Sequence, residues 1–225
     1  MALPLLDGPR LAPAAGGAPR QLVVFLHGYG ADGNDLIGLG REWARDLPHA
    51  AFVSPNAPDP CGMAPTGRQW FDLSLGDMAL IAKGVKDAAP ALETFLDTEL
   101  KRHDLPAQSL ALVGFSQGTM MALAVGLARH PSPAAIVGYS GALANAEALP
   151  KEPGAGPVIL LVHGDMDEVI PVDAMHMARQ TLAQAGLPVE WHVSQGIGHG
   201  IDADGLRLGG AFLRQAFAAS ASPTS

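Results

Sequence analysis

The feature of this sequence that most constrains its fold is the segment Gly114-Phe115-Ser116-Gln117-Gly118 and the pattern around it. An apolar run at residues 109–113 precedes the segment, and a long apolar stretch at residues 119–128 follows it. This order predicts a buried strand, a sharp turn with Ser116 at its tip, and then a helix. Glycine on both sides suits such a turn, because a Cβ two residues from the serine would collide with the neighbouring strand or helix.

The five-residue pattern is only suggestive by itself, since glycine supplies 27 of the 225 residues and flanks some serines by chance. Ser140 illustrates this risk, because Gly138-Tyr139-Ser140-Gly141-Ala142 also ends an apolar run but lacks the second glycine. A simple helix N-cap is the alternative role for Ser116. The rest of the chain has to decide between the two roles.

Composition sets the broad class of the protein. A length of 225 residues with 48% hydrophobic residues fits one α/β domain with a sizeable core. The net charge of −8 argues against nucleic acid and anionic membranes as partners. A single cysteine, Cys61, excludes an internal disulfide and fits a reducing compartment. No apolar run reaches the ~20 residues of a membrane span, and residues 1–20 lack the features of a signal peptide. We therefore expect a soluble, cytoplasmic protein without integral membrane association.

Strand-like and helix-like segments alternate along the chain. We expect strands at residues 21–26, 50–54, 109–115, 134–140, 157–162 and 189–194, with a short edge strand around Arg10-Leu11. We expect helices at residues 36–47, 77–103, 117–130, 171–185 and 204–218, and Pro90 is the point where the second could break. The near-continuous apolar strands predict an α/β fold with a mostly parallel central sheet and helices on both faces. With no internal repeat or linker, residues 1–225 should form a single domain, with its core at about 20–217 and a flexible tail at 219–225.

The longest irregular segment lies between Pro55 and Gly76. Loops of this length in a compact domain are usually functional or flexible. Its apolar side chains, Met63, Trp70, Phe71 and Leu73, could line a substrate groove. Plain anchoring of the loop to the core is the alternative, and the sequence slightly favours it.

Polar side chains follow several of the predicted strands. In a parallel sheet the reacting groups gather at the carboxyl ends of the strands, and Ser116, Asp167 and His199 come at three such ends, in that order. A serine hydroxyl is a poor nucleophile until a base such as His199 takes its proton. A carboxylate has to orient that imidazole and stabilise its charged form. These three residue types therefore predict a nucleophile, a base and an acid.

The choice of acid and base has competitors. Asp165 is the rival of Asp167, but we expect it to serve the turn itself by capping backbone N–H groups. His27 and His163 directly precede glycine at strand ends, where an imidazole more often bonds to loop backbone than takes part in catalysis. His199 differs from the other seven histidines in lying in a glycine-rich loop between the last strand and the last helix.

An oxyanion formed on acyl attack needs two preset N–H donors. The backbone N–H of Gln117, at the start of the helix after Ser116, is one candidate. The backbone N–H of Tyr29, in the loop His27-Gly28-Tyr29-Gly30 after the first core strand, is the other. The chain lacks a phosphate-binding glycine motif and any cluster with metal-ligand spacing, so we expect no cofactor and no metal.

Five stretches together resemble the carboxylesterase/phospholipase family of α/β-hydrolases, which includes acyl-protein thioesterases and bacterial lysophospholipases. They are Phe25 to Gly30, Arg68-Gln69-Trp70-Phe71-Asp72, Gly114 to Gly118, His163 to Pro171 and Gly196 to His199. The resemblance implies an α/β-hydrolase fold without a large cap domain, the triad Ser116, Asp167 and His199, and oxyanion donors at Tyr29 and Gln117. It also implies hydrolysis of carboxylic esters or thioesters without a cofactor.

The chain departs from the usual family pattern at three positions. Tyr29 stands where relatives often have leucine, Phe71 where tyrosine is commoner, and Thr119 where a second glycine is frequent. The first two bear on acyl preference, and Thr119 should tighten the first helical turn.

The function we expect is that of a serine carboxylesterase acting on short- to medium-chain esters as small-molecule substrates. A lysophospholipase or thioesterase for long acyl chains is the alternative within enzymes. A non-catalytic binding protein on the same fold is the alternative of another class. The sequence leaves open whether the chain forms a homodimer. A dienelactone-hydrolase-like enzyme is disfavoured, because the turn carries serine and Cys61 lies in a loop.

Overall fold

A seven-stranded sheet forms the centre of the molecule in the computed structural model, in which residues 3–73, 77–146, 149 and 156–220 are described. The order across this sheet is β1-β3-β2-β6-β7-β8-β9. The strands are β1 (Arg10–Leu11), β2 (Gln21–Leu26), β3 (Ala50–Val53), β6 (Leu110–Phe115), β7 (Ala135–Tyr139), β8 (Val158–Gly164) and β9 (Val189–Ser194). Every neighbouring pair is parallel except β1 and β3, which are antiparallel. The predicted mostly parallel sheet is therefore confirmed.

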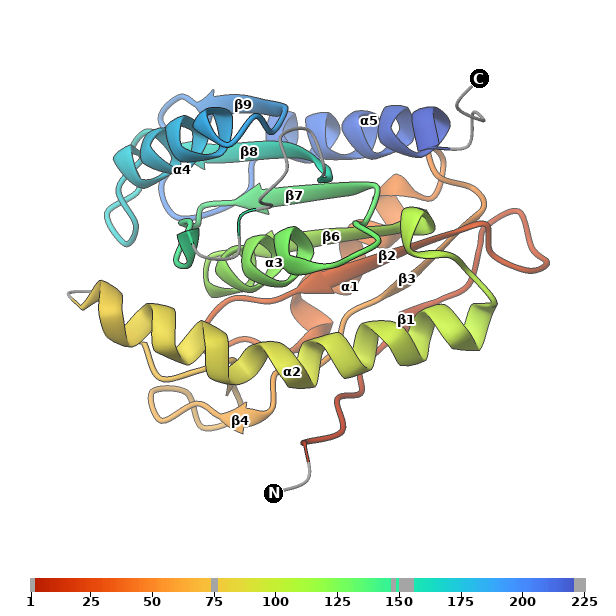
Figure 1. Ribbon diagram of the computed structural model, residues 1–225, viewed down its shortest axis with the longest axis horizontal. Coiled ribbons are helices and arrows are strands. Elements are labelled where there is room, and N and C mark those ends of the chain that lie inside the picture. Colours follow the sequence, from red (N-terminus) through yellow and green to blue (C-terminus); the bar gives the residue numbers. More distant parts are fainter. Residues whose placement is uncertain (1–2, 74–76, 147–148, 150–155, 221–225) are drawn as a thin grey trace.

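Helices cover both faces of this sheet (Figure 1). They are α1 (Gly33–Trp43), α2 (Met78–His103), α3 (Gln117–Ala128), α4 (Asp173–Gln184) and α5 (Ala203–Ser220), with a short 3-10 turn at Ala107–Ser109. Side chains of α1 and α5 share one buried cluster on one face, and side chains of α2, α3 and α4 share a second cluster on the other. In the described part of the chain, no connection carries a further domain that would cap the sheet.

The apolar runs of the sequence correspond to strands that are buried from both sides. All residues of β2 except Gln21 are buried, as are all residues of β6 except Phe115. A strand covered on both faces has no solvent side, so its sequence reads as a continuous apolar run. The expected strand at residues 157–162 extends two residues further, because β8 keeps pairing with β9 as far as Gly164.

Helix α1 begins and ends earlier than the periodicity at residues 36–47 predicts. It begins after Asp32, whose carboxylate accepts a hydrogen bond from the backbone N–H of Asn34 at 2.7 Å. A side-chain cap of this kind starts a helix ahead of its apolar face. Leu47 remains buried, although the helix ends at Trp43.

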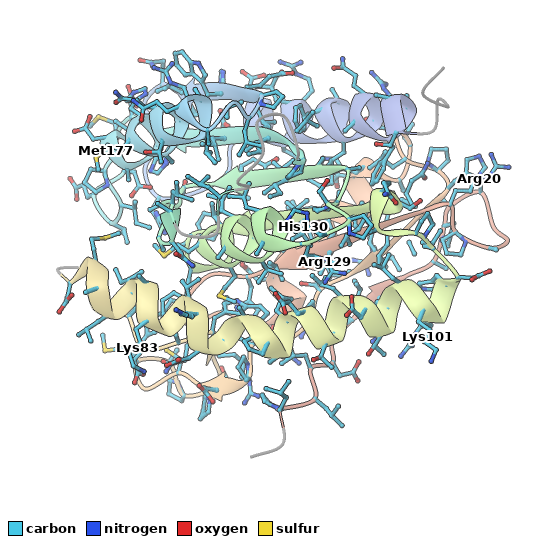
Figure 2. All side chains as sticks on the ribbon, viewed as in Figure 1. Arg20, Lys83, Lys101, Arg129, His130 and Met177 are labelled. Atoms are coloured by element: carbon cyan, nitrogen blue, oxygen red, sulfur yellow. The ribbon has the colours of Figure 1, made fainter. Side chains whose placement is uncertain are left out.

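Helix α2 is continuous through Pro90, so the break considered there does not occur. Proline removes one backbone hydrogen bond and crowds the preceding turn. The helix nevertheless buries apolar side chains on both sides of this point, among them Ile81 and Leu96, and that packing keeps its two halves in line. Its outer side carries charged residues, and Lys83 and Lys101 project from it away from the sheet (Figure 2).

The segment after β3, predicted as irregular, contains a small hairpin-like pairing. β4 (Asp59–Pro60) and β5 (Arg68–Gln69) form a two-stranded antiparallel sheet of their own. The Arg68 guanidinium donates hydrogen bonds to the carbonyls of Ala57 and Pro58, both at 2.9 Å. Residues 74–76 of the predicted loop lie outside the described residues.

β2 and β6 are direct neighbours in the sheet, and strands are added on opposite sides of this pair as the chain proceeds. From β2 the chain moves first to β3 on one side, and later runs from β6 through β9 on the other. Crevices for ligands form at the carboxyl ends of strands at such a switch point. The loops that follow β2 and β6 carry Tyr29 and Ser116 there.

Candidate active site

Ser116 lies on the turn between β6 and α3, in a backbone conformation that residues with a side chain rarely adopt. Its φ is 55° and its ψ is −116°. Its N–H donates to the carbonyl of Tyr139 on the neighbouring strand at 2.9 Å. A Cβ at Gly118 would collide with the carbonyl of Leu26, and one at Gly114 would collide with the backbone of Gly118. Both glycines are therefore required by close approach of the backbone.

Thr119 lies in the first turn of α3, where its backbone N–H donates to the carbonyl of Ser116 at 3.0 Å. Its Oγ1 donates a hydrogen bond of 2.8 Å to the carbonyl of Tyr139, at the end of β7. The same carbonyl accepts the N–H of Ser116. Thr119 therefore ties the start of α3 to the neighbouring strand.

Asp167 and His199 meet although they are 32 residues apart in the chain. His199 Nδ1 lies 2.8 Å from Asp167 Oδ2. A carboxylate only accepts hydrogen bonds, so Nδ1 carries the hydrogen, and Nε2 of the neutral ring is left as an acceptor. The Asp167 side chain is completely buried, whereas that of His199 is 19% exposed. This is the orientation in which an imidazole can take a proton from a hydroxyl.

Backbone groups of its own turn also bind the Asp167 carboxylate. Oδ1 accepts hydrogen bonds of 2.9 Å from the N–H groups of Val169 and Ile170. Burial by itself would raise the pKa of Asp167, but the hydrogen bonds from His199, Ile170 and Val169 outweigh it. The pKa of this carboxyl therefore lies below its ordinary value, and Asp167 is charged at neutral pH.

Asp165, the rival acid, has a different partner. Its Oδ1 accepts a hydrogen bond of 2.6 Å from the N–H of Gly196. The N–H of Met166 donates to the carbonyl of Ile197 at 2.9 Å. We call residues 164–170 the Asp167 turn and residues 196–200 the His199 loop. Asp165 thus caps a backbone N–H as expected, but in the His199 loop rather than in its own turn.

His199 lies against the residue that precedes Ser116. The rings of Phe115 and His199 have centroids 5.0 Å apart and are inclined by 48°. Among the residues that the structure describes, none accepts or donates a hydrogen bond at the Ser116 hydroxyl. Catalytic hydrogen bonds are often long before substrate binds, and this free hydroxyl can turn toward His199 or toward a bound carbonyl.

The two expected oxyanion donors flank Ser116. A Cβ built on Gly28 would lie 3.4 Å from the Cβ of Ser116, so the loop that carries Tyr29 runs directly beside the serine. Within the described part of the chain, neither the N–H of Tyr29 nor that of Gln117 is taken up by a hydrogen bond. Two unpaired N–H groups beside a serine can bind a developing oxyanion.

The Gln117 side chain holds the backbone of residues 70 and 71 next to the turn of Ser116. Its Oε1 accepts the N–H of Trp70 at 2.9 Å, and its Nε2 donates to the carbonyl of Phe71 at 2.8 Å. The Trp70 indole donates to the carbonyl of His27 at 3.0 Å. Residues 70 and 71 are therefore tied both to the turn of Ser116 and to the loop of Tyr29.

The four residues proposed to bind substrate fall into different environments. Trp70 and Phe71 are buried in the core, and Leu73 packs partly buried against the same cluster. Met63 is 84% exposed. This placement supports the anchoring alternative for Trp70 and Phe71, because their rings are used in packing.

Two further histidines support the backbone around the site, as the sequence suggests. His27 accepts the N–H of Ala57 at Nε2, and burial lowers its pKa, so it stays neutral. His163 Nε2 lies 2.7 Å from the carbonyl of Ile170 and 3.1 Å from Asp167 Oδ2. This second approach to Asp167 has no signal in the sequence.

Two features are absent from the described part of the chain. No group of three or more His, Cys, Asp or Glu side chains among them is placed to hold a metal ion. None of their helices is both long enough and apolar enough to span a membrane.

The mostly parallel fold carries a serine on a strained strand-to-helix turn, and a paired aspartate and histidine follow at later strand ends. This arrangement places the fold among the α/β-hydrolases. Comparison with known proteins narrows this class. A family described as Phospholipase/Carboxylesterase matches residues 13–216. The chain therefore belongs to the phospholipase/carboxylesterase family and is a hydrolase of the serine esterase class.

Individual relatives agree with this assignment. Esterase YpfH of Escherichia coli is 31% identical over 186 residues, covering 81% of this chain and 77% of the relative. Acyl-protein thioesterase 1 of Neurospora crassa is 30% identical over 207 residues, covering 85% and 84%. The crystal structure of esterase PE8 is similar with a TM-score of 0.89 and 42% identity, covering 94% of this chain and 99% of that one.

Proposed function

We propose that this chain, as one domain of residues 1–225, hydrolyses short- to medium-chain carboxylic esters through an acyl-enzyme intermediate. Ser116 is the nucleophile, His199 the base and Asp167 the acid. The observation that carries the proposal is the 2.8 Å bond between His199 Nδ1 and Asp167 Oδ2, next to the strained turn of Ser116. It leaves Nε2 as the acceptor for the serine proton.

Acylation begins when Ser116 Oγ forms a bond to the ester carbonyl carbon while its proton moves to His199 Nε2. The carbonyl oxygen becomes an oxyanion, which accepts hydrogen bonds from the N–H groups of Tyr29 and Gln117. The carbon–oxygen bond to the alcohol then breaks, and the proton on His199 passes to the departing alkoxide. The products of this half are a free alcohol and an ester of Ser116.

Deacylation repeats these steps with water as the nucleophile. His199 takes a proton from water, whose oxygen adds to the acyl carbon, and the same donors hold the oxyanion. The bond to Ser116 Oγ breaks as His199 returns the proton to the serine. Asp167 stays ionised throughout, since its lowered pKa disfavours proton uptake, and its charge stabilises the imidazolium.

The acyl preference follows from how the apolar side chains near the site are used. A long acyl chain needs an extended apolar groove. The Trp70 and Phe71 rings, which could have lined one, are buried in the core, and Leu73 is partly buried there. This favours a short acyl pocket over the long-chain specificity of a lysophospholipase or thioesterase.

The decisive experiment measures kcat/KM across p-nitrophenyl esters from acetate to palmitate, with Ser116→Ala as the blank. We expect a maximum at short to medium chains and a loss of several orders of magnitude in Ser116→Ala, with the variant still folded. A maximum at long chains would favour the lysophospholipase or thioesterase alternative. Rates equal to the blank, with no labelling of Ser116 by a fluorophosphonate, would favour a binding protein.

Two further proposals concern the setting of this activity. The single cysteine, which is buried and unpaired, supports action in the reducing cytoplasm. Two exposed apolar side chains, Met177 on α4 (Figure 2) and Trp191 on β9, support a homodimer. Sedimentation of the purified protein distinguishes a monomer from a dimer.

A further inference from the structure

Ser140, like Ser116, has a positive φ, which is unusual for a residue with a side chain. Its φ is 46°, and it directly follows β7 as Ser116 directly follows β6. Each serine also donates its N–H to a carbonyl of the next strand, Ser116 to Tyr139 and Ser140 to Val162, both at 2.9 Å. A residue with a side chain is unfavourable in this conformation and persists there only when its surroundings hold it. Glycine would avoid the strain, so the serine hydroxyl needs an explanation.

The Ser140 hydroxyl reaches the loop that carries His199. Ser140 is fully buried, and its Oγ donates a hydrogen bond of 3.2 Å to the carbonyl of Gly200, the residue after His199. The preceding residue makes a parallel contact, since Tyr139 Oη donates to the carbonyl of Gly205 at 3.0 Å. Tyr139, the last residue of β7, and Ser140, which follows it, therefore hold Gly205 in the first turn of α5 and Gly200 in the His199 loop.

The end of β7 also contacts the turn that carries the nucleophile, Ser116. The carbonyl of Tyr139 accepts both the N–H of Ser116 and the hydroxyl of Thr119. Tyr139 and Ser140 thus touch the Ser116 turn on one side and the His199 loop on the other. A rigid strand end between two reacting groups is a direct way to fix their separation.

We propose that Ser140 is a positioning residue that sets the spacing between Ser116 and His199. The proposal rests on the proposed function, in which these two residues exchange a proton. Asp165 holds the other end of the His199 loop at Gly196, so Ser140 supplies the side-chain tether at the Gly200 end. Loss of this tether lets the imidazole drift from the hydroxyl, which slows proton transfer without altering the surface that binds substrate.

The test compares three variants with the wild type. Ser140→Ala removes the hydroxyl, and Ser140→Gly removes it while accepting the positive φ without strain, so this variant should fold well. Ser54→Ala is the matched control, because Ser54 also follows a strand, is fully buried, and its Oγ has no hydrogen-bond partner among the described residues. Each protein is assayed for kcat, KM, melting temperature and the rate of Ser116 labelling by a fluorophosphonate.

Both Ser140 variants should lose roughly 10-fold in kcat and in labelling rate, with KM within about twofold of wild type. Ser54→Ala should keep the wild-type kcat. Ser140→Gly should melt above Ser140→Ala yet be equally slow, a result that a purely structural role would not produce. A wild-type kcat in Ser140→Gly, whether or not Ser140→Ala is slow, overturns the proposal.

The proposed function fails in a different way. If the wild type hydrolyses no ester, or if Ser116→Ala is as active as the wild type, the nucleophile assignment is lost. If Ser116→Ala is inactive while both Ser140 variants match the wild type, only the positioning role of Ser140 is lost.

Discussion

The Asp167 turn and the His199 loop lie side by side at the carboxyl edge of the sheet, but they are held in different ways. The Asp167 turn has hydrogen bonds of its own in addition to those that join it to the His199 loop, because Asp167 accepts the N–H groups of Val169 and Ile170 within the same turn. The His199 loop is held by hydrogen bonds to residues outside it. Asp165 and Met166 bond to it on one side, and Ser140 bonds to it on the other.

This difference suits the two roles that we propose. An acid that stays ionised and fixed benefits from a rigid, saturated environment, and the Asp167 side chain is completely buried. A base that meets substrate needs an exposed edge, and His199 is 19% exposed. The contrast predicts that the Asp167 turn tolerates change poorly, while changes in the His199 loop matter chiefly where a tether ends.

The largest effect should come from Asp167→Asn. The amide can present its NH2 group to the imidazole and favour the wrong tautomer, and it carries no charge to stabilise the imidazolium. We expect kcat to fall by about 10⁴-fold with little change in KM. The measurement is kcat on a short-chain p-nitrophenyl ester, with circular dichroism to establish folding. A folded variant within tenfold of the wild type would remove Asp167 from the mechanism.

The next effect concerns two glycines, one from each region. A Cβ at Gly164 would collide with the backbone carbonyls of Ile197 and Gly198, whereas a Cβ at Gly200 would meet no atom within 4 Å. Gly164→Ala should therefore lower the free energy of unfolding by roughly 1–3 kcal/mol, and Gly200→Ala should change it by less than about 0.5 kcal/mol. Urea unfolding measures both. Equal stabilities would show that the two regions are not packed as closely as the structure has them.

The sequence predicts the fold correctly where residues close together in the chain determine the local structure. The strands of the sheet read as continuous apolar runs because helices bury both of their faces. Two details escaped the pattern. The start of α1 is set by the Asp32 cap rather than by the apolar periodicity, and α2 passes Pro90 because tertiary packing outweighs the lost hydrogen bond.

The candidate site likewise has parts that the sequence predicts and parts that it does not. Ser116 could be located from the glycines that its turn requires, and the pairing of Asp167 with His199 from the chain order of residues at strand ends. The tether from Ser140 to Gly200 joins a side chain to a carbonyl 60 residues away. Any residue can supply a carbonyl, so such a contact leaves no pattern in the sequence.

A smaller effect is expected from Asp165→Asn. The amide oxygen still accepts the N–H of Gly196, but the bond loses its charge and the His199 loop is held less firmly. We expect kcat to fall by less than about tenfold. The comparison with Asp167→Asn under the same assay is the check. A severe loss here together with a mild loss in Asp167→Asn would exchange the roles of the two carboxylates.

The smallest effect is a pH dependence of stability. Hydrogen bonds hold the pKa of Asp167 below its ordinary value of 3.8, so its ionised form is stabilised by folding. This contribution is fully present above pH 3.8 and is lost as the pH falls through the lower pKa of the folded state. Urea unfolding of the wild type and of Asp167→Asn between pH 6 and pH 3 measures it. The stability advantage of the wild type should shrink toward the acidic end, and an advantage that grows on acidification would mean that the Asp167 turn does not hold a charged carboxylate.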